Sequence, residues 1–261
     1  MKRALITGAN GAVGTALKTH LEAQNIEVIT WNRQQTPIDI YSAMEHFVRE
    51  ANPDALFHLA TASTPTGMEN ESWQVNYVWT SELAWITRQL GIKFVFTSSV
   101  MVFTDDAVGP FTIDSEPNAI DGYGYEKLMA EKRTFHQNPN AIVARLGWQI
   151  GDSAGSNNMI DFFVKQMAEN NHISASTKWY PACSFLVDTA QALHQLTQKG
   201  GGLYQVNSNT KWTFYEIASA LNIKHGNIWT IQPNEDFIYD QRMIDDRVAI
   251  KPLSERLPTL K

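Results

Sequence analysis

The stretch RALITGANGAVGTAL, residues 3–17, sets the expectation for the fold. A short apolar run ends at a turn that carries Gly8, Gly11 and Gly14 at three-residue spacing, and a helical pattern follows. Glycine is required where a chain turns tightly and where backbone must lie close to a pyrophosphate at the start of a helix. We therefore predict a nucleotide site at this turn, with a plain tight turn as the alternative.

Outward from this turn, short apolar runs alternate with helical patterns, which favours a parallel sheet with helices on both faces. We expect an α/β fold with a doubly wound parallel sheet of the Rossmann type over residues 1–150. Glycine-rich loops and a further strand at 203–206 predict a smaller C-terminal substrate lobe over 151–261, intertwined with the first. The predicted strands are 3–7, 27–31, 55–60, 93–98 and 141–146, and the predicted helices are 13–23, 42–51, 73–90 and 124–135.

The composition restricts the partners of the chain. Its 261 residues carry a net charge of −6, with 43% hydrophobic and 18% charged residues, and basic residues are not clustered. This is typical of a globular protein and argues against a nucleic-acid partner. The single cysteine, Cys183, favours a reducing compartment, and we find neither a signal-peptide core nor a membrane span. We expect a cytoplasmic protein with small-molecule partners, no membrane partner and no metal site, because the histidines and the cysteine lack ligand spacing.

The second predicted strand ends in TWNR, residues 30–33, and this stretch contains neither Asp nor Glu. An acidic residue after this strand binds the ribose 2′-hydroxyl of NAD, whereas an arginine accommodates the 2′-phosphate of NADP. We therefore predict NADP(H) over NAD(H), with Arg33 at the phosphate. A solvated loop arginine is the alternative reading, and it leaves the preference open.

The stretch GYGYEKLMAE, residues 122–131, places two tyrosines near one lysine. In a helix, side chains four positions apart are neighbours, so Tyr123 and Lys127 are expected side by side. Tyr125 faces Met129 and is expected in the apolar interior. An ammonium about 4 Å from a phenol contributes about 4 kcal/mol at an effective dielectric of about 20. That is the cost of bringing a pKa of about 10 down to about 7, so we expect Lys127 to lower the pKa of Tyr123.

Together with FTSSVMVF at 96–103, these segments resemble the extended short-chain dehydrogenase/reductases, and most of all the dTDP-4-dehydrorhamnose reductase branch. In that branch the catalytic Ser/Thr lies 24 residues before the tyrosine in a segment ending Val-Phe, as Ser99 does here. The resemblance covers roughly residues 3–220, and of the Arg-Pro and Asn-Ser pattern near the family's C-terminus only Arg242 is kept. Also similar are PDALFHLAT (53–61), VNYVWTSELA (75–84), RLGWQIG (145–151) and FLVDTAQAL (185–193).

The resemblance implies an NADPH-dependent reductase of a nucleotide-linked 4-keto sugar or a related small ketone. It implies that Tyr123, aided by Lys127, supplies a proton while Ser99 binds the carbonyl oxygen. The implied substrate residues are Ser99, Tyr123, Trp148 and Arg242. The implied cofactor residues are Gly8, Asn10, Gly11, Ala12, Val13, Gly14, Asn32, Arg33, Asp39, Ile40, Ala60, Thr61, Ser63, Asn76, Thr97, Tyr123 and Lys127.

Several of these residues have a structural alternative. Asn76 either steadies the lysine or is a buried polar residue bonded to a neighbour. Trp148 either stacks on a sugar or belongs to the core, and Asp39 either lies near the adenine amino group or is an exposed loop residue. His58, inside an apolar strand, is expected to be a satisfied core histidine.

Other functions remain as alternatives. Val100 and Met101 follow Ser99, where the dehydratase branch has Asp-Glu, and this argues against dehydration. A nucleotide-sugar 4-epimerase is one alternative, although those enzymes usually hold NAD. A non-catalytic NADP-binding regulatory subunit, as in the related methionine adenosyltransferase β subunit, is the other. Relatives often dimerise, so a homodimer is a further expectation.

Overall fold

A computed structural model describes residues 1–63 and 65–261 of the chain. Its main element is a parallel sheet of six strands in the order β10-β5-β4-β3-β1-β2. The α/β doubly wound fold predicted from the alternating pattern is confirmed. The strands are β1 (Arg3–Thr7), β2 (Glu27–Thr30), β3 (Ala55–His58), β4 (Lys93–Ser99), β5 (Ile142–Leu146) and β10 (Gly202–Val206).

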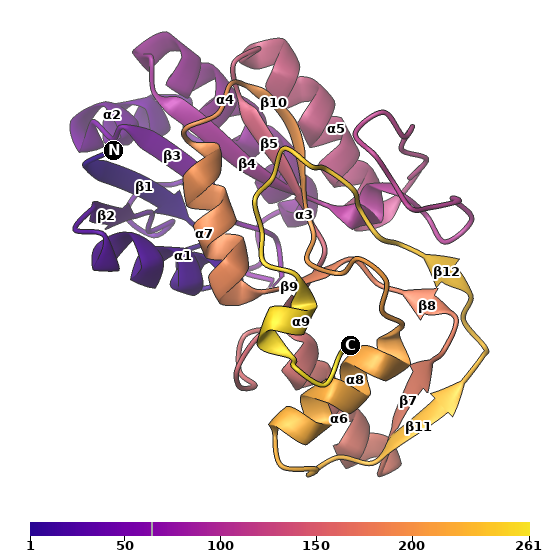
Figure 1. Ribbon diagram of the computed structural model, residues 1–261. Helices are drawn as coiled ribbons and strands as arrows, with labels where there is room; N and C mark the ends of the chain where they lie inside the picture. Colours follow the sequence, from indigo (N-terminus) through magenta and orange to yellow (C-terminus); the bar gives the residue numbers. More distant parts are fainter. Residues whose placement is uncertain (64) are drawn as a thin grey trace.

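Helices cover both faces of this sheet because successive strand residues point to opposite sides. In β1, Ala4 and Ile6 pack with helices α1 (Ala12–Ala23) and α7 (Leu186–Leu196). Leu5, between them, packs with α2 (Tyr41–Ala51) and α4 (Trp79–Leu90) on the other face. Helix α5 (Gly122–Gln137) lies beside α4, and Figure 1 shows α1 and α7 on the side away from them.

The helix predicted over 73–90 is not one regular helix. A short α3 (Glu71–Trp73) leads into a π-helical segment, η1 (Gln74–Val78), before α4 begins. A π turn widens the helix by one residue and re-aims the side chains within it. Asn76 lies in this segment, where it is buried and faces α5, so the exception to the predicted helix falls on a candidate site residue.

A smaller unit lies at the carboxyl ends of the sheet strands (Figure 1). Its core is mostly aromatic and aliphatic and joins α6 (Met159–Asn170), α8 (Phe214–Lys224) and α9 (Leu253–Arg256). Three two-stranded parallel pairs complete it. They are β7 (Ile173–Ser176) with β11 (Ile231–Asn234), β8 (Trp179–Tyr180) with β12 (Tyr239–Asp240), and β6 (Trp148–Ile150) with β9 (Cys183–Phe185).

The chain passes between the two units more than once. After residue 150 it builds part of the smaller unit, and then returns through α7 and β10 to complete the large one. Val248, far along the tail, also packs in the core beneath α1 and α7. A single cut at residue 150 therefore does not separate the two groups of elements, because α7 and β10 pack with the sheet.

Within the part of the chain that the structure describes, no helix has both the length and the apolar character needed to cross a membrane.

Candidate active site

A cavity of about 490 Å³ lies where β1, β4 and β5 end and the smaller unit begins. This is the edge of a doubly wound sheet at which ligands gather. The glycine turn lines one end of the cavity, and Ser99 and Tyr123 line it further along. Of the predicted site residues, the cavity brings together Gly8, Gly11, Ala12, Val13, Gly14, Thr61, Ser63, Thr97, Ser99, Tyr123 and Trp148.

The glycine turn is held by close backbone packing. Gly8 has φ +69, and a Cβ on it would lie 2.7 Å from the backbone nitrogen of Ala60. A Cβ on Gly14 would overlap the carbonyl oxygen of Gly8, so the start of α1 lies against the turn. Only residues without a side chain allow this approach.

The start of α1 has the features of an anion site. Its N-cap is Gly11, no side chain caps it, and its first turn has no acidic residue. The first backbone N–H groups of α1 thus face the cavity without a competing carboxylate. These features fit the pyrophosphate of a dinucleotide, which the turn would hold through backbone groups.

Ser99 and Tyr123 meet because two elements approach closely. Ser99 ends β4, and Tyr123 lies in the first turn of α5. Gly124 makes the approach feasible, because a Cβ there would overlap the carbonyl oxygen of Met101. The hydroxyl of Ser99 lies close enough to Tyr123 to lower the pKa of the phenol, and it accepts the N–H of Met101 at 3.1 Å. The structure thus places side by side two residues that are 24 positions apart in the sequence.

Lys127 lies under this pair and is fully buried. Its Nζ is 5.7 Å from the centre of the Tyr123 ring and 4.7 Å from that of Phe96. It donates a hydrogen bond of 3.1 Å to the carbonyl oxygen of Thr97. The spacing of four residues therefore makes neighbours of Tyr123 and Lys127, as predicted. Tyr125 is half-buried and does not lie deep in the core.

The expected direction of the Tyr123 pKa is wrong for the structure as it stands. Burial is the largest cause that raises the pKa of Tyr123 to about 12; Ser99 acts against it, and the negative charge of Glu126 adds to it. Burial also lowers the pKa of Lys127 to about 7, against the opposing charges of Glu131 and Glu126. The expected lowering required a charged ammonium beside a partly shielded phenol, whereas both side chains are buried and desolvation is the larger effect.

Asn76 bonds to α5 through an acidic residue. Its Nδ2 donates to Glu126 Oε2 at 2.7 Å and to Ser72 Oγ at 3.3 Å. Its backbone oxygen accepts the hydroxyl of Thr80 at 2.9 Å. Its Oδ1 is buried and has no partner among the residues that the structure describes. Sequence reasoning missed Glu126, which stood inside the quoted motif but had no assigned part.

The residues predicted for the adenosine end, Arg33, Asp39 and Ile40, are not among those that line the cavity. Arg33 pairs with Glu71 at 3.1 Å, and Glu71 also accepts the backbone N–H and the hydroxyl of Thr66. The Arg33 side chain remains about one-third exposed, at 34%. Arg33 is therefore partly exposed, and its guanidinium is paired with Glu71. Asp39 and Ile40 are exposed at the start of α2.

The other predicted cofactor residues lie near the cavity without lining it. Asn32 is exposed, and its side-chain oxygen accepts the N–H of Gln34 at 2.9 Å. The N–H of Ala60 donates to the hydroxyl of Thr7 at 3.3 Å. Asn10 is exposed within the glycine turn.

The smaller unit supplies an aromatic and amide wall to the cavity. Trp148 lies 5.9 Å from Trp179, centre to centre, with the rings nearly parallel, and both line the cavity. Gln149 and Gln241 line it too. Gln149 Oε1 and Trp179 Nε1 are buried without hydrogen-bond partners in the described part of the chain. Sequence reasoning missed Trp179, Gln149 and Gln241, which carry no motif of their own.

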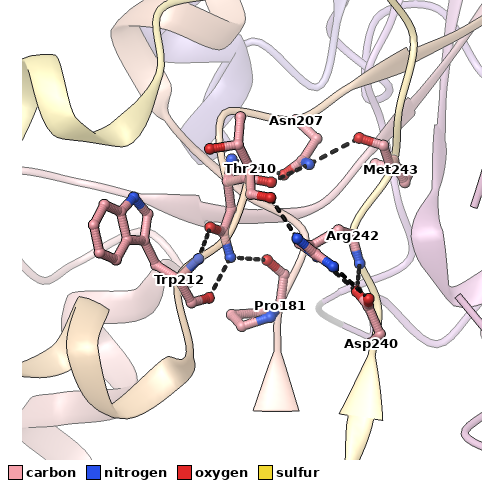
Figure 2. Close-up of polar contacts among 8 residues, drawn as sticks. Pro181, Asn207, Thr210, Trp212, Asp240, Arg242 and Met243 are labelled. Atoms are coloured by element: carbon pink, nitrogen blue, oxygen red, sulfur yellow. Dashed lines mark hydrogen bonds and ion pairs between the residues drawn. The ribbon is translucent and has the colours of Figure 1, made fainter. Parts of the chain in front are cut away.

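Arg242 does not reach this cavity. Its guanidinium binds Asp240 through two nitrogens, at 2.8 and 2.6 Å, and donates to the carbonyl oxygen of Thr210 (Figure 2). It also lies over the ring of Tyr180 at 5.1 Å. It lines a second cavity of about 410 Å³, and its neighbour Gln241 lines the first. The structure thus does not bring Arg242 together with the other predicted substrate residues.

His58 is the core histidine that the sequence predicts. Its Nδ1 bonds to Thr7 at 2.8 Å and its Nε2 to Thr80 at 2.9 Å, so both nitrogens have partners. Burial, and secondarily the charge of Lys127, hold its pKa well below the usual range. Across the described residues 1–63 and 65–261, no group of three or more His, Cys, Asp or Glu side chains is placed to hold a metal ion.

Fold and site together are those of the extended short-chain dehydrogenase/reductase class. A family model, the RmlD substrate binding domain, matches residues 1–233, and the chain belongs to this family. The resemblance drawn from the glycine turn and the Ser-Tyr-Lys set is therefore confirmed at the level of the family.

The curated relatives include both a methionine adenosyltransferase subunit and a reductase. The chain is 25% identical over 240 residues to methionine adenosyltransferase 2 subunit beta of Xenopus tropicalis, covering 84% of this chain and 71% of that protein. It is 28% identical over 168 residues to a dTDP-4-dehydrorhamnose reductase of Sinorhizobium fredii, covering 63% of this chain and 54% of that protein.

Solved structures share the whole fold. A dTDP-4-dehydrorhamnose reductase of Bacillus anthracis, in complex with NADP, superposes with a TM-score of 0.81 at 19% identity and covers 98% of this chain and 97% of that one. A UDP-glucose 4-epimerase of Thermotoga maritima, with UDP-glucose, gives 0.75 at 17% identity, with coverage of 96% and 93%. At these identities the likeness defines the fold, and the function must come from the site.

Proposed function

We propose that this protein is an NADPH-dependent reductase of a nucleotide-linked 4-keto sugar or a related small ketone. One observation carries the proposal: Ser99 and Tyr123 line the same cavity as an uncapped helix N-terminus behind a glycine turn. That arrangement puts a proton donor within reach of a dinucleotide bound through its pyrophosphate. The dTDP-4-dehydrorhamnose reductases among the relatives support the choice of substrate.

The side chains of this site have separable tasks in such a reduction. When bound, a reduced dinucleotide would supply the hydride for the carbonyl carbon. Ser99 donates a hydrogen bond to the carbonyl oxygen and fixes its position, and Tyr123 gives its hydroxyl proton to the developing alkoxide. With its pKa at about 12, Tyr123 carries that proton at neutral pH. Lys127 then stabilises the tyrosinate that is left, from within the same buried layer.

The wall of the smaller unit binds the rest of the substrate. Trp148 and Trp179 offer ring faces for a sugar, and Gln149 and Gln241 offer amides that donate and accept hydrogen bonds to its hydroxyls. No charged side chain lines this cavity in the part of the chain that the structure describes. Among the side chains that line it, the sugar would therefore contact ring faces and amides but no charged group.

NADP(H) is the proposed cofactor, and NAD(H) is the second choice. Arg33 follows β2, where the 2′-phosphate of NADP is read, and no acid lies beside it in sequence. Its pairing with Glu71 weakens the preference, because the same guanidinium must serve both a carboxylate and a phosphate. We further propose a cytoplasmic location and a homodimer, the first supported by the single, buried Cys183.

The test is turnover of NADPH by the purified protein with a panel of 4-keto sugar nucleotides and simple ketones, beside the variants Tyr123→Phe and Ser99→Ala. We expect NADPH oxidation that falls on the order of 1,000-fold in Tyr123→Phe, with NADPH affinity unchanged. Equal rates in Tyr123→Phe and the parent protein would show that Tyr123 does not act as the proton donor.

A non-catalytic regulatory subunit is the second candidate. The similarity to methionine adenosyltransferase 2 subunit beta over 84% of this chain favours it. Tight NADPH binding without turnover on any ketone would support it. Interconversion of sugar nucleotide epimers without net NADPH oxidation would point instead to a 4-epimerase.

A further inference from the structure

Glu126 occupies an unusual place for an acidic side chain. It stands between Tyr125 and Lys127 in α5, and its carboxylate reaches across to the π-helical segment η1. There, Glu126 Oε2 accepts Asn76 Nδ2 at 2.7 Å and Ser72 Oγ at 2.7 Å. The mechanism above uses the residues around Glu126 but gives this carboxylate no task.

The chemistry of these groups allows only one orientation of the Asn76 amide. A carboxylate only accepts hydrogen bonds, so the NH₂ group of Asn76 must face Glu126. Both amide protons then have partners, one in Glu126 and one in Ser72 Oγ. The other end, Oδ1, is turned into a region where it is buried and lacks a partner in the described residues. A flipped amide would place that oxygen against the carboxylate and is excluded by repulsion.

The buried ammonium of Lys127 lies on the neighbouring helix α5. The ammonium of Lys127 has three N–H groups, and among residues 1–63 and 65–261 the structure gives it one oxygen acceptor, the carbonyl of Thr97. Segment η1 packs directly against α5, which carries Lys127. Buried donors and acceptors are normally paired, directly or through a water molecule.

We propose that Glu126 is a positioning residue for the reduction: its carboxylate fixes the Asn76 amide so that Oδ1 faces inward as an acceptor for the Lys127 ammonium. The π-helical segment aims Asn76 at α5, and Glu126 selects which end of its amide points to the interior. This inference rests on the proposed reductase function, because positioning matters only if Lys127 supports catalysis.

The charge of Glu126 has a second consequence. It raises the pKa of Lys127, together with Glu131, against the larger effect of burial. Glu131 is itself paired with Arg145 at 2.7 Å, and the pKa of His58 is held well below its usual range by burial and by the charge of Lys127. Removing the charge of Glu126 therefore favours the neutral amine of Lys127, and it also makes Tyr123 easier to deprotonate.

The test compares Glu126→Gln with the matched control Ser72→Ala, which removes the other contact but keeps the carboxylate. We expect Glu126→Gln to lower kcat about 10-fold with KM for the ketone within about twofold, since the lost contact acts on the transition state. The alkaline limb of the pH profile should move down by about half a unit. Ser72→Ala should keep both values. Unchanged kcat and pH profile in Glu126→Gln would overturn the proposal, as would an equal loss in Ser72→Ala.

A double variant separates positioning from a general effect of the charge. In an Asn76→Ala background, adding Glu126→Gln should change kcat by less than about twofold, because the residue through which Glu126 acts is gone. A full further 10-fold loss in that background would contradict positioning through Asn76.

A readout without turnover keeps this proposal distinct from the proposed function. NMR of protein with ¹³C-labelled lysine side chains, assigned with Lys127→Met, follows the titration of Lys127 directly. We expect its midpoint to fall in Glu126→Gln even if no ketone is reduced. Absence of turnover in the parent protein would reject the reductase, whereas an unshifted Lys127 titration would reject the part assigned to Glu126.

Discussion

The glycine turn after β1 and the tail around Arg242 differ in how they are built. Both were expected to contact a ligand, and both lie next to a cavity. In the turn, backbone atoms do the packing and a helix N-terminus remains uncapped, so the residue types alone define the site. In the tail, an arginine is tied to Asp240 and to the carbonyl of Thr210 (Figure 2). Backbone sites can thus be read from sequence, whereas side-chain sites depend on which partners the fold supplies.

The sharpest test of the backbone site is Gly14→Ala. Its Cβ would overlap the carbonyl oxygen of Gly8, so the turn must move away from α1. Overpacking of this kind costs about 1–3 kcal/mol, and we expect NADPH affinity to fall about 100-fold. Quenching of tryptophan fluorescence measures it. Gly11→Ala is the control, because its Cβ would lie 3.4 Å from the same oxygen. Wild-type affinity in Gly14→Ala would show that the close packing is not needed.

Lys127 tests the opposite case, a side chain whose properties depend on burial. Its pKa in the fold is about 7, below the ordinary value of 10.5, so between these values the unfolded chain holds a proton that the folded protein has lost. Stability then rises with pH. Relative to Lys127→Met, we expect the free energy of unfolding of the parent protein to gain about 2–3 kcal/mol from pH 6 to pH 9. Urea unfolding at both pH values measures it, and parallel pH dependence in the two proteins would contradict the burial effect.

Arg33 lies between the two cases, since it follows β2 as the sequence requires but is held by Glu71. Arg33→Ala should lower NADPH affinity about 10-fold and leave NADH affinity unchanged, because only NADPH carries the extra phosphate. Glu71→Gln should act in the opposite direction by freeing the guanidinium. Arg49→Ala, which removes an arginine paired with Glu45 on α2, is the control. Unchanged NADPH affinity in Arg33→Ala would refute the phosphate contact.

The smallest effect on activity is expected at Arg242. Because its guanidinium lines the second cavity, Arg242→Met should leave kcat/KM within about twofold. Stability should fall by about 1–2 kcal/mol through the lost bonds to Asp240 and Thr210. Steady-state kinetics and thermal unfolding measure the two effects. A loss of kcat/KM above 10-fold would mean that the tail enters the substrate site after all.

Sequence patterns determined the sheet, the glycine turn and the meeting of Tyr123 with Lys127. Each rests on local pattern: short apolar runs that alternate with helical segments, a turn that only glycine fits, and neighbours four positions apart in a helix. Ser99 was found through its interval to Tyr123 in a known family pattern. None of these inferences depends on the residues across the cavity, such as Trp179 and Gln241.

Tertiary structure alone decided the electrostatics and the far wall of the site. The pKa of Tyr123 rises because the fold buries its side chain, and Arg33 is bound by Glu71, which is 38 residues away in the sequence. Trp179 and Gln241 reach the cavity through the pairing of β8 with β12, between segments about sixty residues apart. Burial and pairing across such separations depend on the packed chain as a whole, and for that reason a local pattern of residues does not specify them.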